Sequence, residues 1–337
     1  MYLKRGKAGV RSEFDPNEVC RSDTLREYAM DNEGSASMYT TISLLNALDE
    51  FAEQHFGVEL HQMDREQFIQ AVSEVCRFNV RSIVSILSIL KTYIKWCKMK
   101  GCLPQQYDEY KAYKMHPVFT IDVEDIDFSV SFRKFLLKNP AEVEEFLNIC
   151  CDKNDGSPLT PVSILCWSGV QSRDVYTIRD DDVDTINGTI QYMGETLYVP
   201  QELKQQLRDY RETDVVVKQL RASVNFYREP SDYFIKWYSS KPARAWRPIT
   251  TDVASNAFSR GNPKYQEKYP NRTIYSTNVF MSGRLYVAGH YLLEHGDIDV
   301  QTMIEIFQEK RGMTPLMAKR MHHWICEYNK FVGLTNA

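Results

Sequence analysis

The sequence contains no apolar run that approaches the roughly 18 residues needed by a membrane-spanning helix, so we expect no transmembrane segment. The first 15 residues also lack the apolar core of a secretory signal peptide, which favours a cytoplasmic protein. Aromatic residues make up 12% of the chain and can build a large core, which excludes a disordered chain. The length of 337 residues corresponds to about two domains of roughly 150 residues each.

Signatures of metal, nucleotide and hydrolase chemistry are also missing. The eight cysteines form no CxxC pair and mostly lie in apolar stretches, so we expect reduced, buried thiols. The histidines are scattered except for His322 and His323, whose side chains would point about 100° apart on a helix and make poor metal partners. The acidic run 180–182 is interpreted as a solvated turn. Because no phosphate-binding loop, dinucleotide fingerprint or zinc-protease motif is present, we predict no cofactor and no metal site.

Residues 35–103 are predicted to form a compact helical unit. Apolar residues recur at spacings of three and four in three successive stretches, with candidate N-caps in the run Ser35-Ala36-Ser37 and at Asp64 and Asn79. The preceding residues 1–34 are polar and are expected to form an arm with one short helix around 22–30. The following residues 104–130 are rich in Tyr, Asp and Pro and are predicted to be a linker.

Residues 131–337 are predicted to form a second, larger helical domain that contains one small sheet. Pro140 and Pro161 stand where prolines commonly open helices. Two apolar runs, 189–192 and 196–199, flank a glycine-containing turn and predict a β-hairpin. Helices are expected to resume at residue 201 and to continue to the C-terminus. The predicted fold class is therefore mainly α with a small antiparallel β-sheet.

Acidic residues are absent from 75–107, although the net charge of the whole chain is −4. This stretch carries six Lys or Arg, and Ser88, Lys91 and Lys95 would share one face of a helix. A second basic stretch, 230–293, holds nine Lys or Arg against three Asp or Glu, and a third covers 310–320. Local positive charge of this kind indicates a cradle for the phosphates of duplex DNA. The alternative is that these are ordinary surface lysines and arginines.

Three segments of the chain are similar to motifs of the tyrosine recombinases, the phage integrase family. Residues 79–96 resemble the last helix of that family's core-binding domain. Ser168-Gly169-Val170-Gln171-Ser172-Arg173 resembles the motif of its first catalytic arginine, and Met281-Ser282-Gly283-Arg284 resembles the motif of the second. Their order and spacing extend the resemblance over roughly residues 35–325. The resemblance implies a two-domain clamp, with a helical core-binding domain and an integrase catalytic-like domain.

The chain departs from the catalytic set of this family. The family uses two arginines and a histidine to stabilise charge on the phosphate, a lysine to protonate the leaving oxygen, and a tyrosine as nucleophile. The resemblance places Gln171 at the first arginine, Met281 at a histidine and Met321 at the tyrosine, and the hairpin contains no lysine. Arg284 alone is retained. Tyr286 and Tyr328 are nearby tyrosines, but neither replaces the missing groups, so no catalytic residue and no strand cleavage are expected.

A recombinase-like chain without its catalytic set implies a protein that binds duplex DNA and does not cut it. The expected function is a sequence-specific transcriptional repressor that silences the lytic genes of a prophage, in the cytoplasm and nucleoid of a bacterial host. Its partners would be double-stranded operator DNA and an anti-repressor protein. Alternatives are an accessory or architectural recombination protein, a degenerate active recombinase, and a protein-interaction module. The predicted DNA-binding residues are Arg81, Ser88, Lys91, Lys95, Arg173, Lys241, Arg244, Arg247, Arg284, Lys319 and Arg320.

Overall fold

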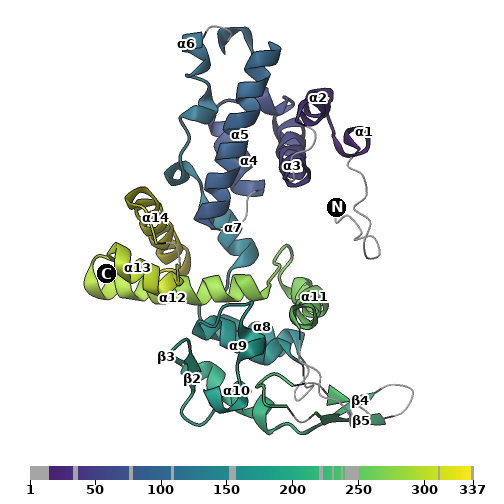
Figure 1. Ribbon diagram of the computed structural model, residues 1–337, viewed down its shortest axis with the longest axis vertical. Coiled ribbons are helices and arrows are strands. Elements are labelled where there is room, and N and C mark those ends of the chain that lie inside the picture. The colour runs from purple at the N-terminus through teal and green to yellow at the C-terminus, as the bar shows by residue number, and fades with distance from the viewer. Residues whose placement is uncertain are drawn as a thin grey trace. The chain divides into compact units, whose positions relative to one another are not determined.

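The chain forms two compact units, Met1–Val130 and Ser131–Ala337 (Figure 1). The computed structural model describes residues 15–32, 37–75, 79–107, 110–151, 157–219, 223–229, 231–236, 238–239, 250–309 and 312–334. The predicted fold class is confirmed, because the described residues are mainly helical with two small antiparallel sheets. No helix among them is both long and apolar enough to cross a membrane.

Five helices begin the N-terminal unit, and the sequence predicted the longer ones. They are α1 (Pro16–Val19), α2 (Asp23–Asp31), α3 (Met38–Phe56), α4 (Arg65–Val75) and α5 (Val80–Lys100). The side chain of Asn79 accepts a hydrogen bond from the Ser82 N–H at 2.8 Å and so caps the start of α5. Gly101 ends α5 in the left-handed conformation, at a φ of 69° that a glycine adopts without strain.

The segment 104–130, which we expected to be a linker, instead contributes to the core of the N-terminal unit. It contains short helices, η2 (Gln105–Tyr107), α6 (Tyr110–Tyr113), η3 (Pro117–Phe119) and η4 (Val123–Asp125), and the start of α7 (Phe128–Phe135). Val118, Val123 and His116 are fully buried. The His116 ring lies edge-on to Phe68 of α4, and its Nε2 is 3.3 Å from the His61 carbonyl oxygen. The segment therefore packs against the N-terminal unit through widely spaced buried side chains, which show no helical periodicity in the sequence.

The C-terminal unit contains the predicted hairpin between helices. Its first part comprises α8 (Pro140–Cys150), α9 (Leu159–Ser168), β1 (Val183–Asp184), β2 (Thr189–Tyr192), β3 (Glu195–Tyr198) and α10 (Gln201–Glu212). Strands β2 and β3 pair antiparallel, with Tyr192 opposite Glu195 across a two-residue turn. The turn residues Met193 and Gly194 both have positive φ, the geometry that matches the twist of a tight hairpin.

A second sheet follows α10, where we had expected helices to continue to the C-terminus. It consists of β4 (Val215–Gln219), β5 (Ser223–Arg228) and β6 (Tyr238–Ser239) in antiparallel order. The prediction was wrong here because the run Val215-Val216-Val217 is β-branched and favours an extended chain. Helices then resume as α11 (Thr251–Lys268), α12 (Ser276–His295), α13 (Val300–Phe307) and α14 (Pro315–Val332).

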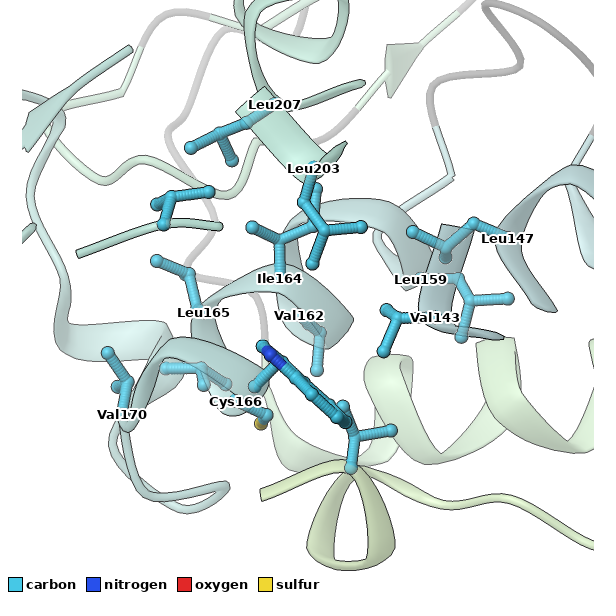
Figure 2. Packing of buried hydrophobic residues seen from close by; sticks show 14 of the residues in the cluster. Val143, Leu147, Leu159, Val162, Ile164, Leu165, Cys166, Val170, Leu203 and Leu207 are labelled. Atoms are coloured by element: carbon cyan, nitrogen blue, oxygen red, sulfur yellow. The ribbon is translucent and has the colours of Figure 1, made fainter. Parts of the chain in front are cut away.

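Helix α9 lies at the centre of the C-terminal core. Its side chains are buried all around, apart from the half-buried Thr160, so it packs against neighbouring elements on every face. Gly283 of α12 lies directly against the backbone carbonyl of Trp167, where any side chain would clash. Figure 2 shows how α9 places Val162, Ile164, Leu165 and Cys166 among side chains that include Val143, Leu147, Leu203 and Leu207. None of the seven described cysteines forms a disulfide.

Candidate nucleic-acid interface

Helix α5 presents one row of exposed side chains along its length. The helix buries its apolar positions, which include Ile83, Leu87, Leu90 and Ile94, and this fixes the opposite face toward solvent. The members of this row follow spacings of three and four, and they are Arg81, Ser85, Ser88, Thr92, Lys95 and Met99. The row holds two cations and three hydroxyls without an acid. From Arg81 to Lys95 it spans about 21 Å at 1.5 Å per residue.

The hydroxyls of this row differ in what they can offer to a ligand. Ser85 Oγ donates to the Arg81 carbonyl and Thr92 Oγ1 donates to the Ser88 carbonyl, both at 2.9 Å. These two oxygens can therefore act only as acceptors toward solvent. Ser88, which is one of the predicted DNA-binding residues, can still donate a hydrogen bond to a ligand. Sequence reasoning missed Ser85 and Thr92, although the spacing from Arg81 to Lys95 would have identified them.

Three lysines of α5, Lys91, Lys98 and Lys100, lie outside the exposed row. Lys91 was expected on the same face as Ser88 and Lys95, but it is half-buried and its Nζ lies 3.5 Å from the Ile121 carbonyl oxygen. Lys100 forms an ion pair with Asp31 at 2.7 Å. Hydrogen bonds from Lys100 and then Trp96 lower the pKa of Asp31, and the hydrogen bond to Asp31 raises the pKa of Lys100. The exposed row of α5 therefore contains fewer lysines than the helix as a whole.

Arg284 of α12 is not at the surface, where we expected it to contact phosphate. Its Nη2 donates to the Ser168 carbonyl at the C-terminus of α9, at 2.9 Å, and the residue is only 7% exposed. Gly169 makes this approach possible, because a Cβ there would lie 2.6 Å from the Arg284 Cζ. The cation satisfies a helix-terminal carbonyl and opposes the negative end of the α9 dipole. Burial lowers the pKa of Arg284 to about 10, so it remains charged at neutral pH.

In the described part of the basic stretch 230–293, three cations are paired with acidic residues. Lys236 pairs with Asp180 at 2.9 Å, Lys268 with Glu145 at 2.5 Å, and Arg272 with Glu142 at 3.1 Å. These acids come from distant parts of the sequence and neutralise the cations in place. Arg260 and Lys264 of α11 are exposed. The predicted DNA-binding residues Lys241, Arg244 and Arg247 lie outside the described residues.

The remaining predicted DNA-binding residues of the C-terminal unit occupy separate elements. Arg173 follows α9, its side chain is 64% exposed, and its Nε lies 3.8 Å from Asp174. It borders an open cavity of about 630 Å³ on the side of the β2–β3 hairpin, where the Tyr192 hydroxyl donates to Asp174 at 2.6 Å. Lys319 and Arg320 lie on α14, the first exposed and the second half-buried.

The structure describes the residues that the resemblance assigned to catalytic positions. Gln171 and Met281 are half-buried and Met321 is buried. Tyr328 is completely buried, and its hydroxyl donates to the Lys138 carbonyl at 2.8 Å. Burial raises the pKa of Tyr328 well above its ordinary value, which disfavours the phenolate that would act as nucleophile. The half-buried Tyr286 stands beside the ring of His290, with 4.4 Å between ring centroids.

Comparison with known proteins gives likenesses of fold at low identity. No protein-family model and no curated protein matches the sequence. Among solved structures the chain is similar to the Tn1549 transposon integrase in complex with transposon right-end DNA. The identity is 13%, the TM-score is 0.36, and the match covers 93% of this chain and 94% of the integrase. It is also similar to the integrase of mycobacterium phage Brujita, with 12% identity, a TM-score of 0.29, and 93% and 97% of the two chains covered.

Proposed function

We propose that this protein is a sequence-specific double-stranded DNA-binding transcriptional repressor of a prophage, which maintains lysogeny by silencing lytic genes. Its fold would be that of a tyrosine recombinase that no longer cuts DNA. The master repressor of SPβ-like phages is the protein that we expect it to resemble in role. An anti-repressor protein would be the partner that relieves repression.

The observation that carries this proposal is the exposed row of α5. Arg81 and Lys95 stand about 21 Å apart at its two ends. The major groove of B-DNA is about 12 Å wide, so cations at this separation can contact the phosphate backbones on both sides of it. The hydroxyls between them, with Ser88 in the middle, are side chains that can hydrogen-bond base edges.

The proposal that the protein does not cut DNA has independent physical support. Loss of one group that stabilises transition-state charge costs about 10²–10³ in rate. Gln171 and Met281 cannot supply the cationic donors that a phosphate needs. The retained Arg284 holds the end of α9, and the Tyr328 hydroxyl is enclosed in the core. These features support a protein that binds DNA without cutting it.

Genome-wide mapping of the bound DNA in a lysogenic host tests the proposal. Enrichment at promoters of lytic genes would support a repressor. Enrichment confined to the attachment sites would favour an accessory recombination protein, and no enrichment would overturn the proposal. Gel shifts at physiological salt should show the enriched fragments binding at least about 10³-fold more tightly than random DNA. The double variant Arg81→Ala/Lys95→Ala should lose this binding, whereas Lys100→Ala is the matched control because Lys100 is already paired with Asp31.

A further inference from the structure

Helix α11 of the C-terminal unit has an exposed face of polar side chains. Its exposed side chains include Ser255, Asn256, Ser259, Arg260 and Lys264. The sequence from 253 to 266 contains no acidic residue. Asn256, Arg260 and Lys264 follow one another at intervals of four, so they form a row of neighbours about 6 Å apart.

The opposite face of α11 is firmly attached to the core. Phe258 stacks on Phe146 with 6.0 Å between ring centroids, and Tyr265 lies edge-on to the same ring at 5.0 Å. The buried Asn262 side chain donates to the Ile274 carbonyl at 2.8 Å and accepts from the Ile274 N–H at 2.9 Å. These contacts hold the exposed row in one orientation, which a recognition surface requires.

Asn256 and Arg260 keep their hydrogen-bonding groups available. Neither side chain forms a hydrogen bond or an ion pair with any residue that the structure describes. In this they differ from Lys268, at the end of the same helix, which is held by Glu145 at 2.5 Å. An exposed carboxamide and an exposed guanidinium, one turn apart, therefore face solvent together.

We propose that Asn256 and Arg260 are specificity-determining residues that read adjacent or nearly adjacent base pairs in the major groove of duplex DNA. The carboxamide matches the N6 and N7 edge of adenine, and the guanidinium fork matches O6 and N7 of guanine. Lys264 continues the row and is placed to contact a phosphate. Arg260 and Lys264 are exposed cations in a stretch, 253–266, that contains no acidic residue, and this favours a polyanion as the occupant. This inference rests on the proposed function, because it names the residues through which that function gains its sequence preference.

Selection of binding sites from a random duplex library tests the assignment with the full chain. We expect the wild-type chain to enrich a motif with one guanine that loses its preference in Arg260→Ala and one adenine that loses it in Asn256→Ala. Each variant should bind the wild-type motif about 10- to 100-fold more weakly. Arg260→Lys should retain the salt dependence and lose the guanine preference, because lysine keeps the charge without the fork. Lys330→Ala on α14 is the charge-matched control, since Lys330 is exposed and pairs only locally, with Glu327.

The outcomes separate this inference from the function on which it rests. If the wild-type chain enriches no motif, the proposed function is overturned and the inference falls with it. If it enriches a motif that Asn256→Ala and Arg260→Ala leave unchanged, the function stands and the inference is wrong. A 7-deazaguanine at the assigned guanine gives a further check, because it lacks the N7 acceptor. It should weaken binding of the wild-type chain and leave Arg260→Ala unaffected; equal weakening of both would overturn the contact. Circular dichroism would establish that each variant is folded.

Discussion

The guanidinium of Arg284 donates a hydrogen bond from Nη2 to the carbonyl oxygen of Ser168, at 2.9 Å. This bond joins α12 to the C-terminus of α9, the most buried helix of the C-terminal unit. The Gln308 side chain donates to the neighbouring Gly169 carbonyl at 2.8 Å, so two side chains from distant segments satisfy the end of α9. A residue that sequence comparison associates with catalysis thus has a structural role here.

Replacement of Arg284 by alanine should destabilise the C-terminal unit. The change removes a charge-assisted hydrogen bond and leaves the buried Ser168 carbonyl without its donor, which should cost about 2–3 kcal/mol of unfolding free energy. Urea unfolding followed by tryptophan fluorescence measures this loss. Unchanged stability together with weaker DNA binding would instead support the phosphate contact that the sequence suggested.

Gly169→Ala should also destabilise the protein, and by more than an alanine at an ordinary helix end. Gly169 has a φ of 117°, and its new Cβ would lie 2.6 Å from the Arg284 Cζ. Gly296→Ala at the end of α12 is the matched control, because Gly296 has a φ of 77° and open space around it. We expect about 1–2 kcal/mol for the control and a larger loss for Gly169→Ala in the same urea unfolding measurement. Equal losses would show that the guanidinium moves aside without cost.

The exposed cations of α5 should determine part of the salt dependence of DNA binding. Arg81→Ala and Lys95→Ala should each weaken binding to all sequences and reduce the slope of log K against log salt by about 1, since one phosphate contact is lost. Lys91→Ala should have a smaller effect because Lys91 is half-buried beside Ile121. Fluorescence anisotropy at four salt concentrations measures the slope, and equal slopes for all the variants and the wild type would place the DNA elsewhere.

The sequence predicted those elements whose signals are local. Asn79 and Gly101 bracket α5, and the turn at Met193 and Gly194 produces the β2–β3 hairpin, because capping and turn geometry depend on neighbouring residues. The second sheet was missed because a short apolar run is compatible with both a strand and a buried helix, although the three β-branched valines after α10 favour the strand.

The candidate interface was less predictable because lysines and arginines pair with acidic residues that lie far away in the sequence. Lys236 meets Asp180 and Lys268 meets Glu145, and no local pattern indicates either pair. Composition therefore overestimated the basic surface of 230–293. The acid-free stretch around α5 remained informative because no acid lies within its own helix, although Lys100 still found Asp31 on another one.

The buried position of Tyr328 predicts that the chain forms no covalent adduct with DNA. A nicked suicide duplex incubated with the wild-type chain should yield no protein–DNA band on a denaturing gel. Tyr328→Phe should lower the unfolding free energy by about 1 kcal/mol, because the hydrogen bond to the Lys138 carbonyl is lost. An adduct that disappears in Tyr328→Phe, or in Tyr286→Phe, would revive an active recombinase.

The burial of His116 predicts that the unfolding free energy of the N-terminal unit falls as the pH falls. Burial lowers the pKa of His116 to about 4, whereas a histidine in the unfolded chain titrates near 6.5. The unfolded state therefore binds a proton first as the pH falls. The contribution of the neutral His116 to the unfolding free energy is fully present above about pH 6.5 and is lost progressively toward pH 4.

Between pH 7 and pH 5 this difference should remove about 2 kcal/mol of unfolding free energy. His116→Gln, which cannot titrate, should reduce the pH dependence by this amount, although it lowers stability at pH 7 because the ring lies against Phe68 and Tyr107. His55→Gln on the exposed side of α3 is the matched control. Hydrogen exchange of the amides in η3 and α5, measured at both pH values, reports on the N-terminal unit alone. If His116→Gln retained the full wild-type pH dependence, the loss would have to come from another group, of which the buried His61 is the nearest, because burial lowers its pKa in the same direction.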